Sequence, residues 1–201
     1  MHESSPTPNF FERIWDGFAE RAYGAHARGW LAFLSFSESS FFVIPPEILL
    51  LPMIAARPDK WLSLGLLTSA TSVLGAVFGY AIAFFFFDAF GVRIIELYHL
   101  EEPFAYVGEL FERNNFWVMF TAAFTPLPYK VAVLAGGFFK ISFVEFLVAS
   151  IIGRTLRYLI ISYGAAVFGP HATKLALRYA GISTVIAVIL VGAVVLWKFV
   201  L

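Results

Sequence analysis

The sequence contains no cysteine among its 201 residues. This absence excludes disulfide bonds, thiolate metal sites and a cysteine nucleophile. The four histidines, His2, His26, His99 and His171, stand apart from one another outside the apolar segments. No pair of them has the spacing of metal ligands, so we expect surface histidines, no metal and no other cofactor.

Charged residues are also few. They make up 14% of the chain, while hydrophobic residues make up 60%. Soluble domains carry about 25% charged and roughly 45–50% apolar residues. This composition therefore predicts an integral membrane protein that has lipid as its solvent. The 14 basic and 14 acidic residues cancel to a formal net charge of zero, which gives no support to a nucleic-acid partner.

Long apolar runs are what the sequence has in place of charge. They predict transmembrane helices at about 61–87, 141–168 and 179–201, because a helix needs about 20 residues to cross a bilayer. Gly75 and Gly79 in the first run have the spacing of a close helix–helix contact. We therefore expect an all-α protein with three transmembrane helices.

Two stretches are more polar. Residues 1–28 hold a polar tail and then, at 10–24, an amphipathic pattern that places apolar and charged side chains on opposite faces of a helix. This pattern predicts an interfacial helix at the membrane surface. Residues 88–115 carry many charges, which predicts surface helices there, with a break at Pro103.

Two further apolar segments, about 29–56 and 116–139, are interrupted by prolines. The breaks are expected at Pro45, Pro46, Pro126 and Pro128. Proline removes a backbone donor and pushes the preceding residue out of the α region, so a straight helix cannot continue. Each half is too short to span a bilayer, and each segment therefore predicts a re-entrant helical hairpin.

The order of broken segment, span and polar stretch, followed by a second broken segment and span, indicates an internal repeat. Pro46 aligns with Pro128 and Gly75 with Gly153. Basic residues outside the apolar segments favour one side, which predicts a cytoplasmic N-terminus and hairpins that enter from opposite faces. We expect a transport core at 29–178, since paired broken segments are typical of transporter binding sites.

Five ionisable residues lie within apolar segments, where each costs roughly 2.5–3.5 kcal/mol to insert. They are Glu38, Glu47, Lys130, Arg154 and Arg157. The acids come from the first half and the bases from the second, which predicts a central cavity lined by both signs. The bases would bind an anionic headgroup and the acids would carry protons. Alternatively, these residues are ion pairs that fix hairpin packing.

The second half carries a group of motifs within residues 124–158. They are Pro126 with Leu134-Ala135-Gly136, then Lys140-Ile141-Ser142, then Gly153-Arg154-Thr155-Leu156-Arg157-Tyr158. The first half adds Glu38 and Pro45-Pro46-Glu47. In order and spacing these motifs resemble the DedA/VTT membrane protein family, its YqaA-like branch in particular. Many members carry two arginines around the proline of the second hairpin. In this chain only Lys130 is basic there, and Phe124 and Thr125 stand where the first arginine would be expected.

The resemblance implies a transporter or flippase of the bacterial inner membrane that moves a phospholipid or polyprenyl phosphate, with proton coupling. Two other classes stay open. An enzyme acting on lipid phosphates would need a cluster of catalytic side chains that the sequence does not contain, so we expect no enzyme. A scaffold could use the Gly75/Gly79 face and the last span as partner surfaces. The oligomeric state stays open, a homodimer included.

Overall fold

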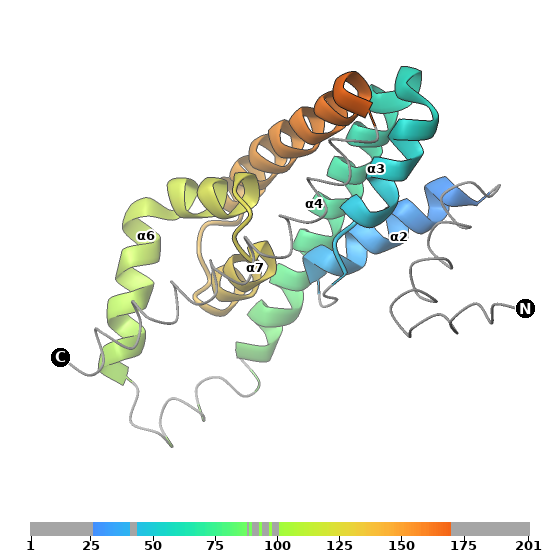
Figure 1. Ribbon diagram of the computed structural model, residues 1–201. Coiled ribbons are helices and arrows are strands. Elements are labelled where there is room, and N and C mark those ends of the chain that lie inside the picture. Colours follow the sequence, from blue (N-terminus) through green and yellow to red (C-terminus); the bar gives the residue numbers. More distant parts are fainter. Residues whose placement is uncertain are drawn as a thin grey trace, which may run out of the picture.

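The computed structural model describes residues 26–40, 44–87 and 101–169, with residues 89, 93 and 97 between them. The elements in this part are helices (Figure 1). They are α2 (Ala27–Ser40), α3 (Glu47–Ala56), the short 3-10 helix η1 (Pro58–Lys60), α4 (Trp61–Phe86), α6 (Glu101–Phe124), α7 (Tyr129–Phe138) and a helix over 143–169. The predicted all-α fold is thus confirmed for this part. The amphipathic stretch 10–24 and the span 179–201 lie outside the described residues.

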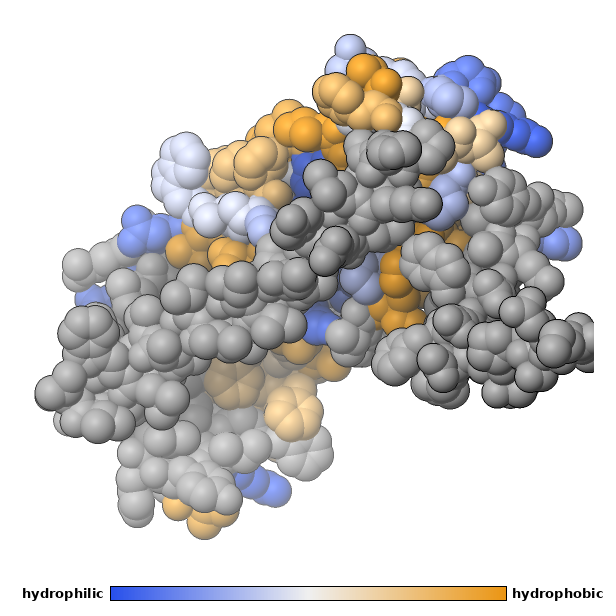
Figure 2. All heavy atoms as spheres, viewed as in Figure 1, coloured by the Kyte–Doolittle hydropathy of each residue, from blue (hydrophilic) through white to orange (hydrophobic). Residues whose placement is uncertain are grey.

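The predicted span at 61–87 is the continuous helix α4. Within the described residues, Pro58–Phe86 is the one helix that is long and apolar enough to cross a membrane by length and composition. Large apolar side chains are exposed on α4 and on helix 143–169, and they follow helical spacing along the latter. Examples are Leu66, Leu74, Phe78, Phe85, Val144, Val148, Ile151, Ile160 and Val167. Figure 2 shows apolar side chains along the edge formed by helix 143–169. An outward apolar face is what lipid contact requires.

Both proline-rich segments fold as helix, break and helix. The first helix α2 ends at Ser40 and α3 begins at Glu47 with Pro46 as its N-cap residue, while α6 ends at Phe124 and α7 begins after Pro128. The carbonyl of Pro46 accepts the amide protons of residues 49 and 50. A proline fits at a helix start because amide groups there have no acceptor within the helix. The predicted breaks at 29–56 and 116–139 are confirmed.

Pro52 and Pro103 lie inside α-helices. Pro103 is the third residue of α6 and lies within its first turn, so a break between helices would lie before Glu101, at residues 98–100, which are outside the described residues. Proline is tolerated there because its missing amide would have no partner. The irregularity of α6 lies instead at Asn114, whose backbone angles are not helical (φ −133°, ψ 21°). Pro52 lies inside α3 without ending it.

The two aligned glycines occupy equivalent places. A Cβ atom on Gly75 of α4 would meet the backbone of Phe36 in α2. A Cβ atom on Gly153 would lie 2.6 Å from the Cβ of Ala123 in α6. At the aligned glycine each long helix therefore packs closely against the first helix of the broken pair that precedes it, which agrees with the predicted alignment of Gly75 with Gly153.

Two apolar clusters hold the elements together. One joins α2 and α3 to α4 and helix 143–169 through residues such as Leu31, Leu50 and Tyr158. The other joins α4, α6 and α7 to helix 143–169 through residues such as Tyr80 and Phe146. Both long helices thus contribute to both clusters, and the two broken pairs are fixed on one scaffold.

We expect Tyr80→Phe to lower the free energy of unfolding by about 1 kcal/mol. The buried Tyr80 hydroxyl donates a hydrogen bond of 2.7 Å to the carbonyl of Ile141, in the turn after α7. Phenylalanine keeps the ring contacts with Phe146 and Phe143. Denaturant titration in micelles measures the loss, and an unchanged stability would mean that this bond adds nothing to the attachment of α7.

Candidate functional site

A cavity of about 330 Å³ lies where the two helix breaks meet helix 143–169. All five ionisable residues that the sequence singled out line this cavity: Glu38, Glu47, Lys130, Arg154 and Arg157. Pro45 borders it from the first break, and Pro126 and Pro128 border it from the second. The structure therefore brings the five charges and both breaks together, as the predicted cavity of mixed sign requires.

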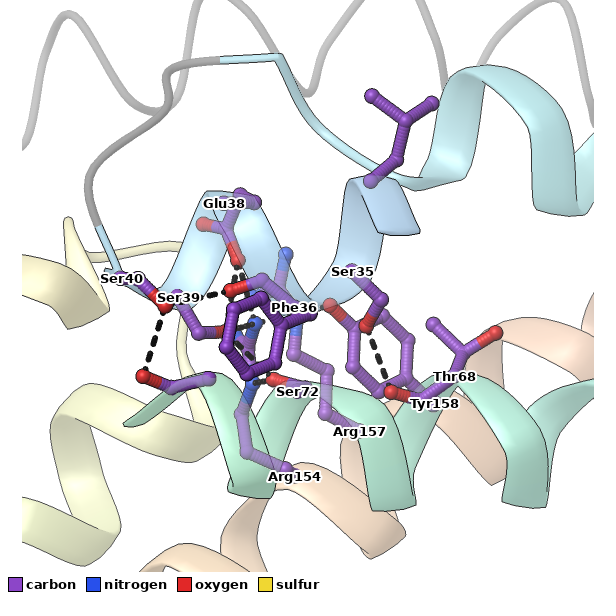
Figure 3. A network of polar contacts seen from close by, with 12 residues as sticks. Ser35, Phe36, Glu38, Ser39, Ser40, Thr68, Ser72, Arg154, Arg157 and Tyr158 are labelled. Carbon is purple, nitrogen blue, oxygen red and sulfur yellow. Dashed lines mark hydrogen bonds and ion pairs between the residues drawn. The ribbon is translucent and has the colours of Figure 1, made fainter. Parts of the chain in front are cut away.

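The first ion pair joins Glu38, near the end of α2, to Arg154 of helix 143–169. The Nη2 atom of Arg154 lies 2.7 Å from Glu38 Oε2, and the Arg154 side chain is only 3% exposed. The same nitrogen donates to the hydroxyls of Ser39 and Tyr158, and Nε donates to Ser72 at 2.5 Å. Figure 3 shows Arg154 and Glu38 pointing toward each other within this network. A buried charge is tolerated when it is paired and hydrogen-bonded in this way.

Aromatic rings enclose the Arg154 guanidinium. Its carbon lies 4.6 Å from the ring centre of Tyr129 in α7 and 4.9 Å from that of Tyr158. Both tyrosines are fully buried. A cation over an aromatic face is stabilised by the negative potential of the ring, and more strongly without water. The sequence did not lead us to predict that Tyr129 and Tyr158 contact Arg154. The position of Tyr158 one helical turn after Arg154 could have indicated its contact.

The second ion pair joins the two breaks. Arg157 Nη2 lies 3.0 Å from Oε1 of Glu47, the first residue of α3. Arg157 Nη1 donates a hydrogen bond of 2.6 Å to the carbonyl of Thr125, directly after α6 ends. Carbonyls at a helix C-terminus lack partners within the helix and carry partial negative charge. One guanidinium thus links the start of α3 to the end of α6.

Serines connect α2 to α4 beneath the cavity, and sequence analysis did not single them out. Ser35 donates to the Thr68 carbonyl at 2.6 Å, Ser40 donates to the Gly75 carbonyl at 2.8 Å, and Ser39 shares a 2.7 Å hydrogen bond with Ser72. Ser35 and Ser39 are four apart, so they share a face of α2. That spacing was the available signal, and the small side chains let the two helices approach closely.

The described residues contain no group of three or more His, Asp or Glu side chains that could hold a metal ion. The cavity is lined by fixed charges. It presents three cations and two anions, and both anions are already paired with arginines. Such a site can bind an anion, and it can exchange one anionic partner of an arginine for another.

A VTT domain matches residues 44–167, which include both breaks and both arginines. The chain belongs to the VTT family. VTT proteins are membrane-associated, and with the apolar helix α4 this makes the chain a membrane protein.

Two VTT relatives are uncharacterized bacterial proteins. One, from Haemophilus influenzae, is 33% identical over 156 residues, which cover 78% of this chain and 81% of the relative. The other, from Histophilus somni, is 31% identical over 184 residues, covering 90% and 96%. No solved structure matches the chain.

The site also bears on the arginine that the resemblance led us to expect at Phe124 and Thr125. The guanidinium of Arg157 lies against the Thr125 carbonyl. A positive charge therefore reaches this break from helix 143–169. At the second break, Arg157 of helix 143–169 thus adds a positive charge to that of Lys130, the second residue of α7.

Proposed function

We propose that this VTT protein is a transporter or flippase that moves an anionic lipid headgroup through the cavity between the two breaks. The observation that carries the proposal is that three cations, Lys130, Arg154 and Arg157, line one cavity between the breaks. Arginine binds phosphate oxygens through paired N–H groups. A phospholipid or a polyprenyl phosphate has the required headgroup.

Two helix starts support anion binding. Glu47 is the first residue of α3 and Lys130 the second of α7, and both line the cavity. The N-terminal ends of α3 and α7 thus face the same space. The helix dipole gives each such end a partial positive charge. The two ends add to the attraction that the arginines exert on a phosphate.

The proposal places the breaks at the middle of a bilayer. In it, α2–α3 and the helices around the second break are re-entrant hairpins that enter from opposite faces, and α4 and helix 143–169 are spans. Their outward apolar side chains support this placement. The protein then lies in the bacterial inner membrane with its N-terminus in the cytoplasm, and Glu38 and Glu47 are the groups that would couple transport to protons.

Arg157→Gln is expected to lower lipid flux at least about tenfold, because a hydrogen bond to a charged group contributes about 1.5–3 kcal/mol. Flux is measured in vesicles that contain the purified protein and a fluorescent anionic phospholipid, through loss of fluorescence when a membrane-impermeant quencher reaches the label. Arg28→Gln is the matched control, since Arg28 is an exposed arginine on α2 outside the cavity.

Equal flux in folded Arg157→Gln and Arg28→Gln protein would contradict the proposal. The proposal assigns no chemical step to the chain, so phosphate release from a lipid by the purified protein would revive the enzyme alternative. The scaffold alternative loses one of its two surfaces. Gly75 and Gly79 are covered by α2, and Gly79 also faces Val133 of α7.

A further inference from the structure

The two ion pairs in the cavity have the same composition but differ in how tightly each arginine is held. The Arg154 side chain is 3% exposed and donates to Glu38, Ser39, Ser72 and Tyr158. The Arg157 side chain is 18% exposed and donates to Glu47 and to the Thr125 carbonyl. Arg154 is therefore fixed by its surroundings, whereas Arg157 has only two hydrogen-bond partners in the part of the chain that the structure describes.

Arg157 also keeps an unused donor. Its Nε atom is buried and has no hydrogen-bond partner among the described residues. A buried donor without a partner costs about 1–3 kcal/mol, so a further acceptor in the cavity would be stabilising. A phosphate has enough oxygens to accept from Nε and Nη2 together, in the paired geometry that arginine favours. Nη2 is the atom that Glu47 now occupies.

We propose that the carboxylate of Glu47 holds the place of the substrate anion on Arg157, and that a phosphate group binds by displacing it. This inference rests on the proposed function and names which charges act in it. In this binding step Arg157 exchanges Glu47 for the phosphate, while Arg154 and Glu38 stay paired and keep α2 attached to helix 143–169. The acid thus competes with the substrate for the base.

Displacement of Glu47 has a mechanical consequence. Glu47 begins α3 and Thr125 directly follows α6, and the Arg157 guanidinium contacts both. When a phosphate takes Nη2, the bond between the two breaks is lost, and the start of α3 is free to move from the end of α6. Anion binding and separation of the breaks are then one event, as transport through this space requires.

The test is a binding experiment on folded protein in neutral micelles. The probes are dioctanoyl phosphatidate, inorganic phosphate and, as a ligand without phosphate, dioctanoylglycerol. Glu47→Gln is expected to bind phosphatidate about tenfold more tightly than the unchanged chain, because the amide no longer competes as an anion. Arg157→Gln is expected to lose this binding, and Arg157→Lys to retain part of it, since lysine keeps the charge but not the paired donors.

Glu38→Gln is the matched control, because it makes the same chemical change in the other ion pair. We expect no comparable gain in phosphatidate affinity, since Arg154 keeps its hydrogen bonds to Ser39, Ser72 and Tyr158 and its aromatic contacts. If Glu38→Gln does not fold, Glu145→Gln on an exposed position of helix 143–169 measures the effect of lost negative charge alone. A gain in Glu47→Gln that the control matches, or a gain for dioctanoylglycerol, would overturn the inference.

The outcomes separate this inference from the proposed function. A gain for phosphatidate alone supports displacement by a lipid headgroup, and an equal gain for inorganic phosphate supports displacement by the phosphate group itself. Unchanged affinity in Glu47→Gln overturns the displacement but leaves the proposed function standing if Arg157→Gln still abolishes flux. If the unchanged chain binds neither phosphate probe and flux does not depend on Arg157, both are overturned.

Discussion

Replacing Arg154 with methionine is expected to lower the free energy of unfolding by about 3–5 kcal/mol, the loss typical when one member of a buried ion pair is removed. Methionine has a similar volume but leaves the Glu38 carboxylate, 20% exposed, without its cation. It also leaves Ser72 and Tyr158 without their donor. The effect is measured by denaturation in mixed micelles of SDS and a neutral detergent.

A second substitution separates the lost pair from general damage. In Glu38→Leu with Arg154→Met both charges are removed, and we expect the double variant to recover most of the lost stability, because an apolar replacement of a whole pair is often neutral. Arg157→Gln is expected to cost less than Arg154→Met, since the Arg157 side chain is more exposed and has fewer partners. A double variant no more stable than Arg154→Met would mean that Arg154 is held by its ring and serine contacts and not by Glu38.

The two breaks and the five charged residues that line the cavity could be predicted because each depends on a local rule. Proline ends a helix wherever the chain runs, so the positions of Pro46 and Pro128 were enough to place the starts of α3 and α7. An ionisable residue in an apolar segment needs a partner in any fold. Opposite signs in the two halves therefore indicated that Glu38 and Glu47 would meet Arg154 and Arg157.

Which acid meets which base could not be predicted. Arg154 and Arg157 lie on one helical face and are three residues apart, so the choice depends on the rotation of α2 and on where α3 begins relative to helix 143–169. The contact of Tyr129 with Arg154 could not be predicted either, because it depends on how α7 packs beside helix 143–169. The kink at Asn114 has no proline to mark it.

Gly75→Ala is expected to lower the free energy of unfolding by at least about 2 kcal/mol, and Gly75→Val to yield no folded protein. The added Cβ would meet the carbonyl oxygen of Phe36, and it would lie 2.8 Å from the carbonyl carbon and 2.9 Å from the Cα. These are backbone atoms, which cannot turn away as a side chain can. Because the Ser40 hydroxyl is bonded to the Gly75 carbonyl, moving α2 away would also lengthen that bond.

Whether Gly75→Ala lowers or raises the stability tests the packing of α2 against α4. In a helix interior alanine is normally more stable than glycine by about 0.5–1 kcal/mol. Gly29→Ala in α2 and Gly164→Ala in helix 143–169 are expected to show that gain, because a Cβ at either position meets nothing within 4 Å. Denaturation of the three alanine variants under one condition measures the contrast. A gain in stability at Gly75 equal to that at Gly29 would show that α2 and α4 do not touch there. In that case α2 would not hold Glu38 at the cavity.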